Sequence, residues 1–415
     1  MKLLALALAC LPAMQSARST EPFPSASTKK GLQVQMVDDA LALGIGHAAL
    51  NLDLAQVLDL HGDPANPGWK HGEQTYHFKE SALEAFEAQL KPLSEHGVIV
   101  YAILLARESG DAELDRVLLH PKYDKSAPNH LGEFNTVSEE GQRCLEATIE
   151  FLAERWSRAD HHYGRVAGWI VGNEVNSHWF WANMGPASLE EFAADYARVL
   201  RVVCGAVRRE SSSARVYVSL EHHWNMHYPG GDETQCFAAR PFLERLAALA
   251  GDVDWNVAFH PYPENLFEPR TWLDQSATAS DDTPRITFKN IELLPRFLAR
   301  EPLLFKGKPR HAILSEQGFH TPDGPEGEFA QAAAYCYAWK KIEKLDGIDA
   351  FILHRHVDHR DEGGLRLGLW SRDPASICTP LAKKKLWEVF RLAGSAEEDR
   401  AFAFALPLIG LEHWP

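Results

Sequence analysis

The sequence predicts an α/β fold, a (β/α)8 TIM barrel with long loops after its strands. Eight apolar runs alternate with amphipathic stretches from Gly31 onward, and this alternation is typical of a parallel sheet covered by helices. Eight strand–helix pairs are the number that closes such a sheet into a barrel. A doubly wound open sheet is the rival fold, but no glycine-rich phosphate fingerprint follows the first strand.

The expected strands are short apolar runs. In chain order they cover residues 32–36, 46–50, 98–105, 166–171, 215–220, 253–259, 312–315 and 348–353. Runs that are apolar on both faces are typical of strands buried on both sides. The segments after several strands are long, for example 108–136, 175–187 and 263–282. In a barrel these loops rise on one face and surround one pocket.

Helices are predicted where apolar residues recur every three or four positions. The four clearest stripes are Leu83, Phe86, Leu90 and Leu93; Leu145, Ile149, Leu152 and Trp156; Phe192, Tyr196, Val199 and Val203; and Phe329, Ala333, Cys336 and Trp339. Gly97 ends the first helix as a C-terminal glycine. Ser188 and Glu191 have the spacing of a capping box at the start of the third. Further helices are expected near 241–249, 290–298 and 381–392.

Length and charge limit the class of protein. The 415 residues are 45% hydrophobic and carry a net charge of −15, which fits a large soluble core and argues against nucleic acid as a partner. We predict one barrel domain over residues 31–393 and a tail, 394–415, packed on its outside. The sequence leaves the oligomeric state open.

The first 18 residues have the form of a secretory signal. A basic start, Met1-Lys2, precedes an uncharged stretch from Leu3 to Cys10, too short to span a bilayer. We therefore predict a secreted or periplasmic protein with no integral membrane span, against the alternative of a buried N-terminal segment. Cys10 is a candidate lipoprotein acceptor. The other five cysteines give no disulfide framework, and the absence of CxxC and HExxH motifs argues against a structural zinc site.

Two glutamates follow buried-looking strands at the ends of which α/β barrels carry out their chemistry. Asn173-Glu174 comes after the strand at 166–171, and Glu316 comes after the strand at 312–315. One carboxylate alone would be read as an ion-pair partner or a helix cap. Two that face one pocket can protonate a leaving oxygen and stabilise an oxocarbenium ion, which is what cleavage of a glycosidic bond requires.

The chain resembles the clan of retaining (β/α)8 glycosidases that includes the family 5 cellulases and mannanases. The motifs that carry the likeness are Asn173-Glu174 after the fourth strand, His260-Pro-Tyr262 after the sixth and Glu316 after the seventh. The resemblance implies that Glu174 is the acid/base and Glu316 the nucleophile. It further implies that Asn173 holds the sugar 2-hydroxyl and that Tyr262 orients Glu316.

The end of the eighth strand departs from that clan. Many members place a tryptophan there, whereas this chain has a charged run from His354 to Glu362. Several relatives also hold an arginine after an early strand, and Arg107 is the only nearby candidate here. The run allows a salt-bridged scaffold, hydrogen bonds to sugar hydroxyls from residues such as Arg355 and His356, binding of an acidic sugar through Arg355 or Arg360, or a metal site.

A metal site in this run would use its histidines and one aspartate. His354, His356 and Asp358 would share a face if the strand stayed extended, and His359 follows them. No second set of ligands is evident. We therefore predict no metal and no cofactor.

Other polar and aromatic residues are expected at the pocket mouth. Glu221 and His222 end the fifth strand, and Glu221 is the main competitor as a catalytic carboxylate unless it pairs with a cation. Flat indole rings can stack on a pyranose or anchor a loop. The candidate rings are Trp179, Trp181, Trp224 and Trp370. Asn51, after the second strand, is also placed for the pocket.

We predict from these observations a retaining glycoside hydrolase that cleaves an oligo- or polysaccharide by double displacement. Two alternatives remain at this stage. One is a catalytically silent carbohydrate-binding barrel, which would fail to bring the two carboxylates together. The other is a metal-dependent barrel hydrolase that uses the histidines of the eighth strand. Fold alone does not decide among them.

Overall fold

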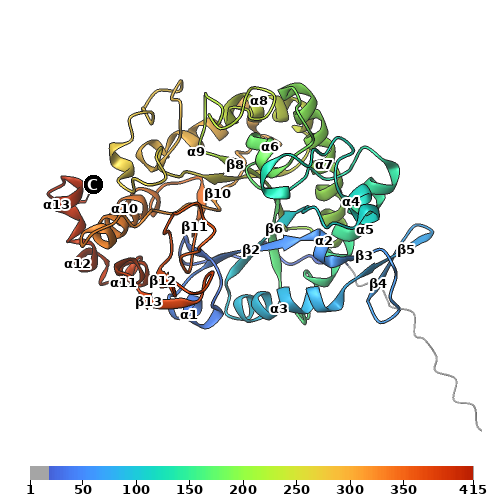
Figure 1. Cartoon of the computed structure of the whole chain (residues 1–415), viewed down its shortest axis with the longest axis horizontal. Coiled ribbons are helices and arrows are strands. Elements are labelled where there is room, and N and C mark those ends of the chain that lie inside the picture. Colours follow the sequence, from blue (N-terminus) through green and yellow to red (C-terminus); the bar gives the residue numbers. More distant parts are fainter. Residues whose placement is uncertain (1–17, 415) are drawn as a thin grey trace, which may run out of the picture.

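The eight predicted strands form one closed barrel of parallel strands (Figure 1). In the computed structural model, which describes residues 18–414, each barrel strand pairs with its neighbours in the order β1-β11-β10-β9-β8-β7-β6-β2, and β1 closes the ring against β2. The strands are β1 (Lys30–Gln33), β2 (His47–Asp53), β6 (Ile99–Leu105), β7 (Val166–Val171), β8 (Arg215–Glu221), β9 (Trp255–His260), β10 (Ala312–Leu314) and β11 (Ile348–Leu353). The (β/α)8 fold is therefore confirmed. The predicted signal segment and Cys10 lie outside the described residues, apart from Arg18.

Alternate residues of the strands fill the inside of the barrel and the layer outside it. On β6, Tyr101 and its neighbours two positions away belong to the inner core, whereas Val100 and Leu104 belong to the core between sheet and helices. Gly168 of β7 leaves room for the rings of Tyr101 and Tyr217, which meet edge to face across the interior. A packed interior of this kind makes the barrel a rigid base for the loops at its mouth.

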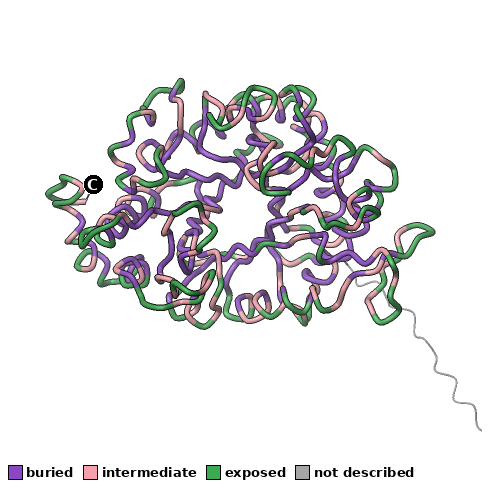
Figure 2. Tube along the Cα trace, in the orientation of Figure 1, coloured by how far each residue is buried: buried purple, intermediate pink, exposed green. Residues whose placement is uncertain are grey.

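Helices cover the outside of the barrel. The main ones are α1 (Val37–Ala42), α3 (Glu80–Glu95), α5 (Glu139–Arg155), α7 (Leu189–Glu210), α8 (Ala239–Ala250), α9 (Leu293–Leu298), α10 (Gly327–Ile342) and α11 (Lys385–Leu392). The predicted apolar stripes are buried except for Phe329, which is 39% exposed. The capping box of Ser188 and Glu191 is present at the start of α7. Figure 2 shows the buried trace following the strands and the inner sides of these helices.

Several elements were not expected from the sequence. A three-stranded antiparallel sheet of β3 (Leu58–Asp59), β4 (Gly68–His71) and β5 (Gln74–Phe78) interrupts the connection from β2 to α3, together with α2 (Leu54–Val57). The loop after β6 contains α4 (Ala112–Leu118). A hairpin of β12 (Trp370–Arg372) and β13 (Pro380–Lys383) occupies part of the segment expected to begin the last helix. All of these insertions follow strands.

The last residues form two short helices, α12 (Glu398–Phe402) and α13 (Ala405–Ile409). Phe402 and Ala405 are buried in the outer core, and the Trp339 indole of α10 donates to Glu398 at 2.7 Å. Figure 1 places these helices at the opposite edge of the molecule from the β4–β5 hairpin. Within residues 18–414, no helix is both long and apolar enough to cross a bilayer.

We predict that Gly168→Ala lowers the free energy of unfolding by about 1–3 kcal/mol, as overpacking of a filled core does. A β-carbon at this position would lie 2.2 Å from Cδ1 of Tyr101 and 3.1 Å from Cε2 of Tyr217. Both rings are fully buried, so neither can move away without disturbing other residues. Urea unfolding measured by circular dichroism tests this.

The matched control is Gly205→Ala on α7, where the new β-carbon meets only the tip of Arg209 at 3.9 Å. Alanine is the better helix former, so this variant should be as stable as the parent or up to about 1 kcal/mol more stable. Equal stability of the two variants would contradict the packing described for the barrel interior.

Candidate active site

Glu174 is held at the mouth of the barrel by an unusual backbone turn. After β7 the chain passes through Gly172 and reaches Glu174, both at positive φ, 75° and 39°. A left-handed conformation is costly for a residue with a side chain, and residues held in it cluster at active sites and other constrained turns. The Glu174 amide donates to the Ser219 hydroxyl at 3.0 Å, which ties the turn to β8.

Glu316 lies two residues beyond β10 and receives hydrogen bonds on both carboxylate oxygens. The Tyr262 hydroxyl donates to Oε1 at 3.1 Å, and the Gln33 amide donates to Oε2 at 2.9 Å. Tyr262 comes from the loop after β9 and Gln33 from the end of β1. The carboxylate is thus fixed from two directions. The contact with Tyr262 agrees with the role that the resemblance implied for this tyrosine.

His260, the last residue of β9, lies between the two glutamates. Its Nδ1 contacts Oε1 of Glu174 at 2.9 Å, and its Nε2 contacts the Ser315 hydroxyl at 3.0 Å. One side-chain atom from each of Glu174, His260 and Glu316 lies within 4.8 Å of the other two. An oxygen–oxygen approach within this limit is compatible with the roughly 5–5.5 Å carboxyl separation of retaining glycosidases, and it is shorter than the roughly 6.5–9.5 Å of inverting ones.

The surroundings shift the two carboxyl groups in opposite directions. Burial raises the pKa of Glu174, and the bond to His260 only partly opposes this. Burial would also raise the pKa of Glu316, but the charges of His354 and His260 and the bond from Gln33 outweigh it, so this pKa lies below its ordinary value. Glu174 is therefore the group suited to carry a proton, and Glu316 the group suited to be ionised.

The carboxylate of Glu221, the competing candidate, is engaged in hydrogen bonds within the protein. It accepts from the Asn176 amide at 2.7 Å, from the Ser177 hydroxyl at 3.2 Å and from the His223 backbone amide at 2.8 Å, and it also contacts the His223 ring. These bonds join the end of β8 to the residues after Glu174. His222 is buried as well, and burial lowers its pKa to about 3. Glu221 therefore stabilises the loop that follows Glu174.

The polar run after β11 does not gather its side chains as an extended strand would. His356 contacts Asp39 of α1 at 2.9 Å, and Asp358 pairs with Lys384 at 2.8 Å. His354 instead faces Gln33 and Glu362. The peptide bond between His354 and Arg355 is cis. The shared metal site considered for His354, His356 and Asp358 is therefore wrong, because the chain leaves the sheet after Leu353 and the three side chains diverge.

Among the described residues, two groups of three have ligating atoms within 4.8 Å of one another. They are Glu174, His260 and Glu316, and the consecutive residues Glu221, His222 and His223. In the second group, Glu221 is already occupied by the donors named above. The first group is the candidate active site itself.

The four tryptophans that were predicted to stack on a sugar differ in burial and contacts. Trp224 is 2% exposed and packs edge to face against Phe259 and Phe297, so its assignment as a sugar platform is wrong. The residues next to Trp224 in the sequence are polar, but the side chains that surround it in the fold include the apolar rings of Phe259 and Phe297. Trp370 is half-buried and donates to Asp39 at 2.8 Å. Trp179 and Trp181 lie half-buried on α6 (His178–Trp181), directly after the Glu174 turn.

Other predicted residues line or border the mouth. Asn173 is half-buried beside Glu174. Arg355 pairs with Glu362. Arg107 donates to the Asn129 carbonyl at 2.9 Å and is 49% exposed, so it does not contact either glutamate. Gln33 was not predicted, because a glutamine at a strand end belongs to no recognisable motif.

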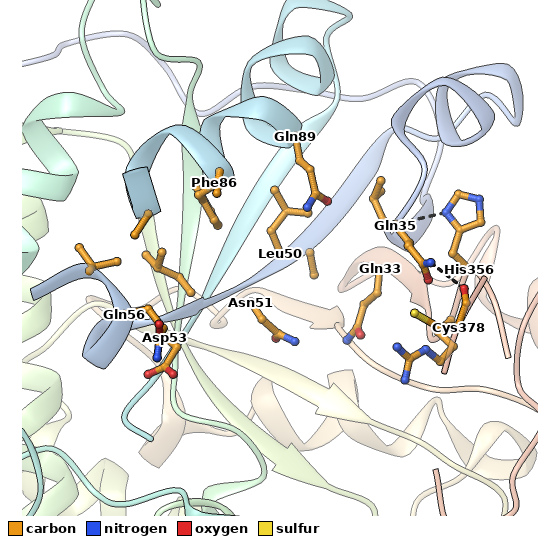
Figure 3. A pocket seen from close by; sticks show the side chains of 17 residues that line it. Gln33, Gln35, Leu50, Asn51, Asp53, Gln56, Phe86, Gln89, His356 and Cys378 are labelled. Carbon is orange, nitrogen blue, oxygen red and sulfur yellow. Dashed lines mark hydrogen bonds between the residues drawn. The ribbon is translucent and has the colours of Figure 1, made fainter. Parts of the chain in front are cut away.

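A groove of about 650 Å³ is lined by residues of β1, β2 and α3, among them Gln33. Gln33 connects the groove to the pair of glutamates, because it lines the groove and also donates a hydrogen bond to Glu316. Figure 3 shows Gln33 and Asn51 pointing into the groove from the strands, with Phe86 and Gln89 on α3 opposite and Asp53 and Gln56 at one end. Its size and its amide groups suit a hydroxyl-rich small molecule.

The fold and the site define a (β/α)8 barrel with two opposed carboxylates at the carboxyl ends of its strands. Within this class, the chain belongs to a family of unknown function, DUF5722, whose model matches residues 22–415. A search of curated proteins found no match.

Solved structures similar to this chain include glycoside hydrolases. A family 39 glycoside hydrolase from Bacteroides cellulosilyticus superposes with a TM-score of 0.56 at 15% identity, over 88% of this chain and 60% of that one. The present chain thus spans less than two thirds of that neighbour. A β-glucosidase from Pyrococcus furiosus gives 0.55 at 16% identity, over 90% and 86%. A family 1 β-glucosidase from Thermotoga maritima gives 0.52 at 11% identity, over 86% and 84%. At these identities the likeness is one of fold.

We predict that Glu221→Gln destabilises the protein more than Glu174→Gln does. The Glu221 carboxylate accepts from several buried donors, and a glutamine would replace one of its oxygens with an NH2 group that cannot accept. Leaving a buried donor without an acceptor costs about 1–3 kcal/mol. Glu174 has one side-chain bond, to His260, which a glutamine oxygen can still accept, and its substitution removes a buried acidic group. Thermal and urea unfolding of the two variants measure the difference. A stable Glu221→Gln protein beside a destabilised Glu174→Gln protein would reverse the roles assigned to these residues.

Proposed function

We propose that this protein is a retaining glycoside hydrolase acting on an oligo- or polysaccharide. The observation that carries the proposal is the approach of Glu174 and Glu316 to within 4.8 Å, with opposite shifts of their pKa values. The fold of the glycoside hydrolase neighbours supports it. A silent carbohydrate-binding barrel has no need of such a pair.

The reaction proceeds in two displacements. The ionised Glu316 attacks the anomeric carbon, while Glu174 gives its proton to the departing glycosidic oxygen. This forms a glycosyl ester on Glu316 and releases the leaving group as an alcohol. Glu174, now a carboxylate, removes a proton from water. The water oxygen attacks the anomeric carbon and breaks the ester, which restores both groups.

The surrounding residues assist this chemistry by position. Tyr262 and Gln33 donate to Glu316 and hold its carboxylate for attack. His260 contacts Glu174 and returns it to one orientation between the two steps. We further propose that the groove over β1 and β2 accepts part of the carbohydrate, and that the protein acts after export, as its first residues suggest.

We predict that Glu316→Gln abolishes hydrolysis of every glycoside the parent cleaves, because no ester can form. Glu174→Gln should lower kcat/KM by about 10²–10⁴-fold on substrates with poor leaving groups. Dinitrophenyl glycosides, whose leaving group needs no proton, should still form the ester. The assay is a panel of aryl glycosides and polysaccharides, repeated with a chelator.

Azide provides a sharper readout for both residues. It should restore turnover in Glu174→Ala and give a glycosyl azide of retained configuration, because the ester still forms first. In Glu316→Ala it should give the inverted azide by direct attack. Full activity in either glutamine variant, or loss of parent activity with the chelator, would place the chemistry elsewhere in the protein.

The activity of the parent should follow a bell-shaped pH profile. The acidic limb reports ionisation of Glu316, whose pKa is lowered, so it should fall below the ordinary glutamate range. The alkaline limb reports loss of the Glu174 proton, whose pKa is raised, so it should lie above that range. The measurement is kcat/KM against pH with an activated and an unactivated aryl glycoside. Only the unactivated substrate should show the alkaline limb strongly, and equal limbs for both would contradict the acid role of Glu174.

A further inference from the structure

The nucleophile of the proposed reaction is connected through Gln33 to the polar run after β11. Gln33 Nε2 lies 2.9 Å from Glu316 Oε2, and Gln33 Oε1 lies 2.6 Å from Nδ1 of His354. The other ring nitrogen of His354, Nε2, lies 3.0 Å from Oε1 of Glu362. Four side chains from β1, β10 and the loop after β11 thus form one chain of hydrogen bonds.

The directions of these hydrogen bonds define the protonation of the imidazole. A carboxylate accepts only, so Gln33 must turn its N–H group to Glu316 and its carbonyl oxygen to His354. Nδ1 of His354 must therefore donate. Glu362 also accepts from the Arg355 guanidinium, and a carboxylate paired in this way only accepts hydrogen bonds. Nε2 of His354 must therefore also donate.

An imidazole that donates from both nitrogens carries a positive charge. The charged and titratable groups around it are Glu362, the Arg355 guanidinium that pairs with Glu362, the nearby His359, and Glu316 beyond Gln33. His354 is 8% exposed. In such a site a positive charge acts over several ångströms with little screening by water.

We propose that Glu362 holds His354 as an imidazolium behind Glu316, and that Gln33 passes its hydrogen bond to the nucleophile. His354, Gln33 and Glu362 are positioning residues on this view, since none of them forms the ester. His354 supplies the positive charge near Glu316 that Arg107, which donates to the Asn129 carbonyl, does not. The inference rests on the proposed function for its catalytic meaning, but the charge relation itself can be tested without any substrate.

The test is the titration of Glu316, followed by the ¹³C signal of its side-chain carboxyl in glutamate-labelled protein. The signal is assigned as the one missing from Glu316→Gln. In His354→Gln the positive charge is gone, so Glu316 should bind its proton more readily and its titration midpoint should move up by about one pH unit. Gln33→Met, which keeps the shape and removes the donor, should move it in the same direction. This second variant leaves the His354–Glu362 pair in place should His354→Gln fold poorly.

A matched control exists at the opposite end of β10. His311 contacts Asp349 at 2.8 Å in a similar histidine–carboxylate pair, and His311→Gln should leave the Glu316 midpoint where it is. In active preparations the acidic limb of kcat/KM should move upward in His354→Gln and Gln33→Met and stay unchanged in His311→Gln.

An unmoved Glu316 midpoint in both folded variants would overturn the inference. A moved midpoint in a protein that hydrolyses no glycoside would leave the inference standing and remove the proposed function instead.

Discussion

The site depends on one buried imidazole, because His260 joins the carboxyl ends of three strands. It contacts Glu174 after β7 at 2.9 Å, and its other nitrogen faces Ser315, just after β10, at 3.0 Å and Ser219 of β8 at 3.4 Å. Burial would lower the pKa of His260, but the bond to Glu174 and the charges of the glutamates outweigh burial and raise it. The charge of His260 also lowers the pKa of Glu316, which favours the ionised form of that carboxylate.

The two glutamates differ because different elements hold them. Glu174 stands on a left-handed turn and has one side-chain partner, so burial dominates its pKa. Glu316 accepts from Tyr262 and Gln33 and lies near two histidines, so bonding and charge dominate. The assignment of acid and nucleophile can therefore be argued from the scaffold without reference to any relative.

The barrel could be predicted from the sequence, because runs that are apolar on both faces fit only a covered parallel sheet. All eight strands lie within a few residues of the predicted ranges. The insertions could not be predicted, since the β3–β5 sheet is short and shows no strong alternation. In the site, Glu174, Glu316 and His260 could be predicted because each stands at the end of a predicted strand, and the carboxyl ends of all barrel strands meet at one face. The contact of Gln33 with Glu316 and the burial of Trp224 depend on residues distant in sequence, so no local sequence pattern predicts them.

The ion-paired run after the eighth strand explains how Glu316 comes to be supported from this side. Alternation of side chains holds only while the backbone stays in the sheet, and β11 ends at Leu353. Beyond it, His354 turns inward to Gln33, while His356 turns outward to Asp39 on α1, where Trp370 and Trp387 also donate. The outward contacts fix the loop against the helix layer. These contacts hold His354 in a fixed position although it lies in a loop. A fixed position matters because Glu316, which His354 supports through Gln33, must be precisely oriented to attack a single carbon atom.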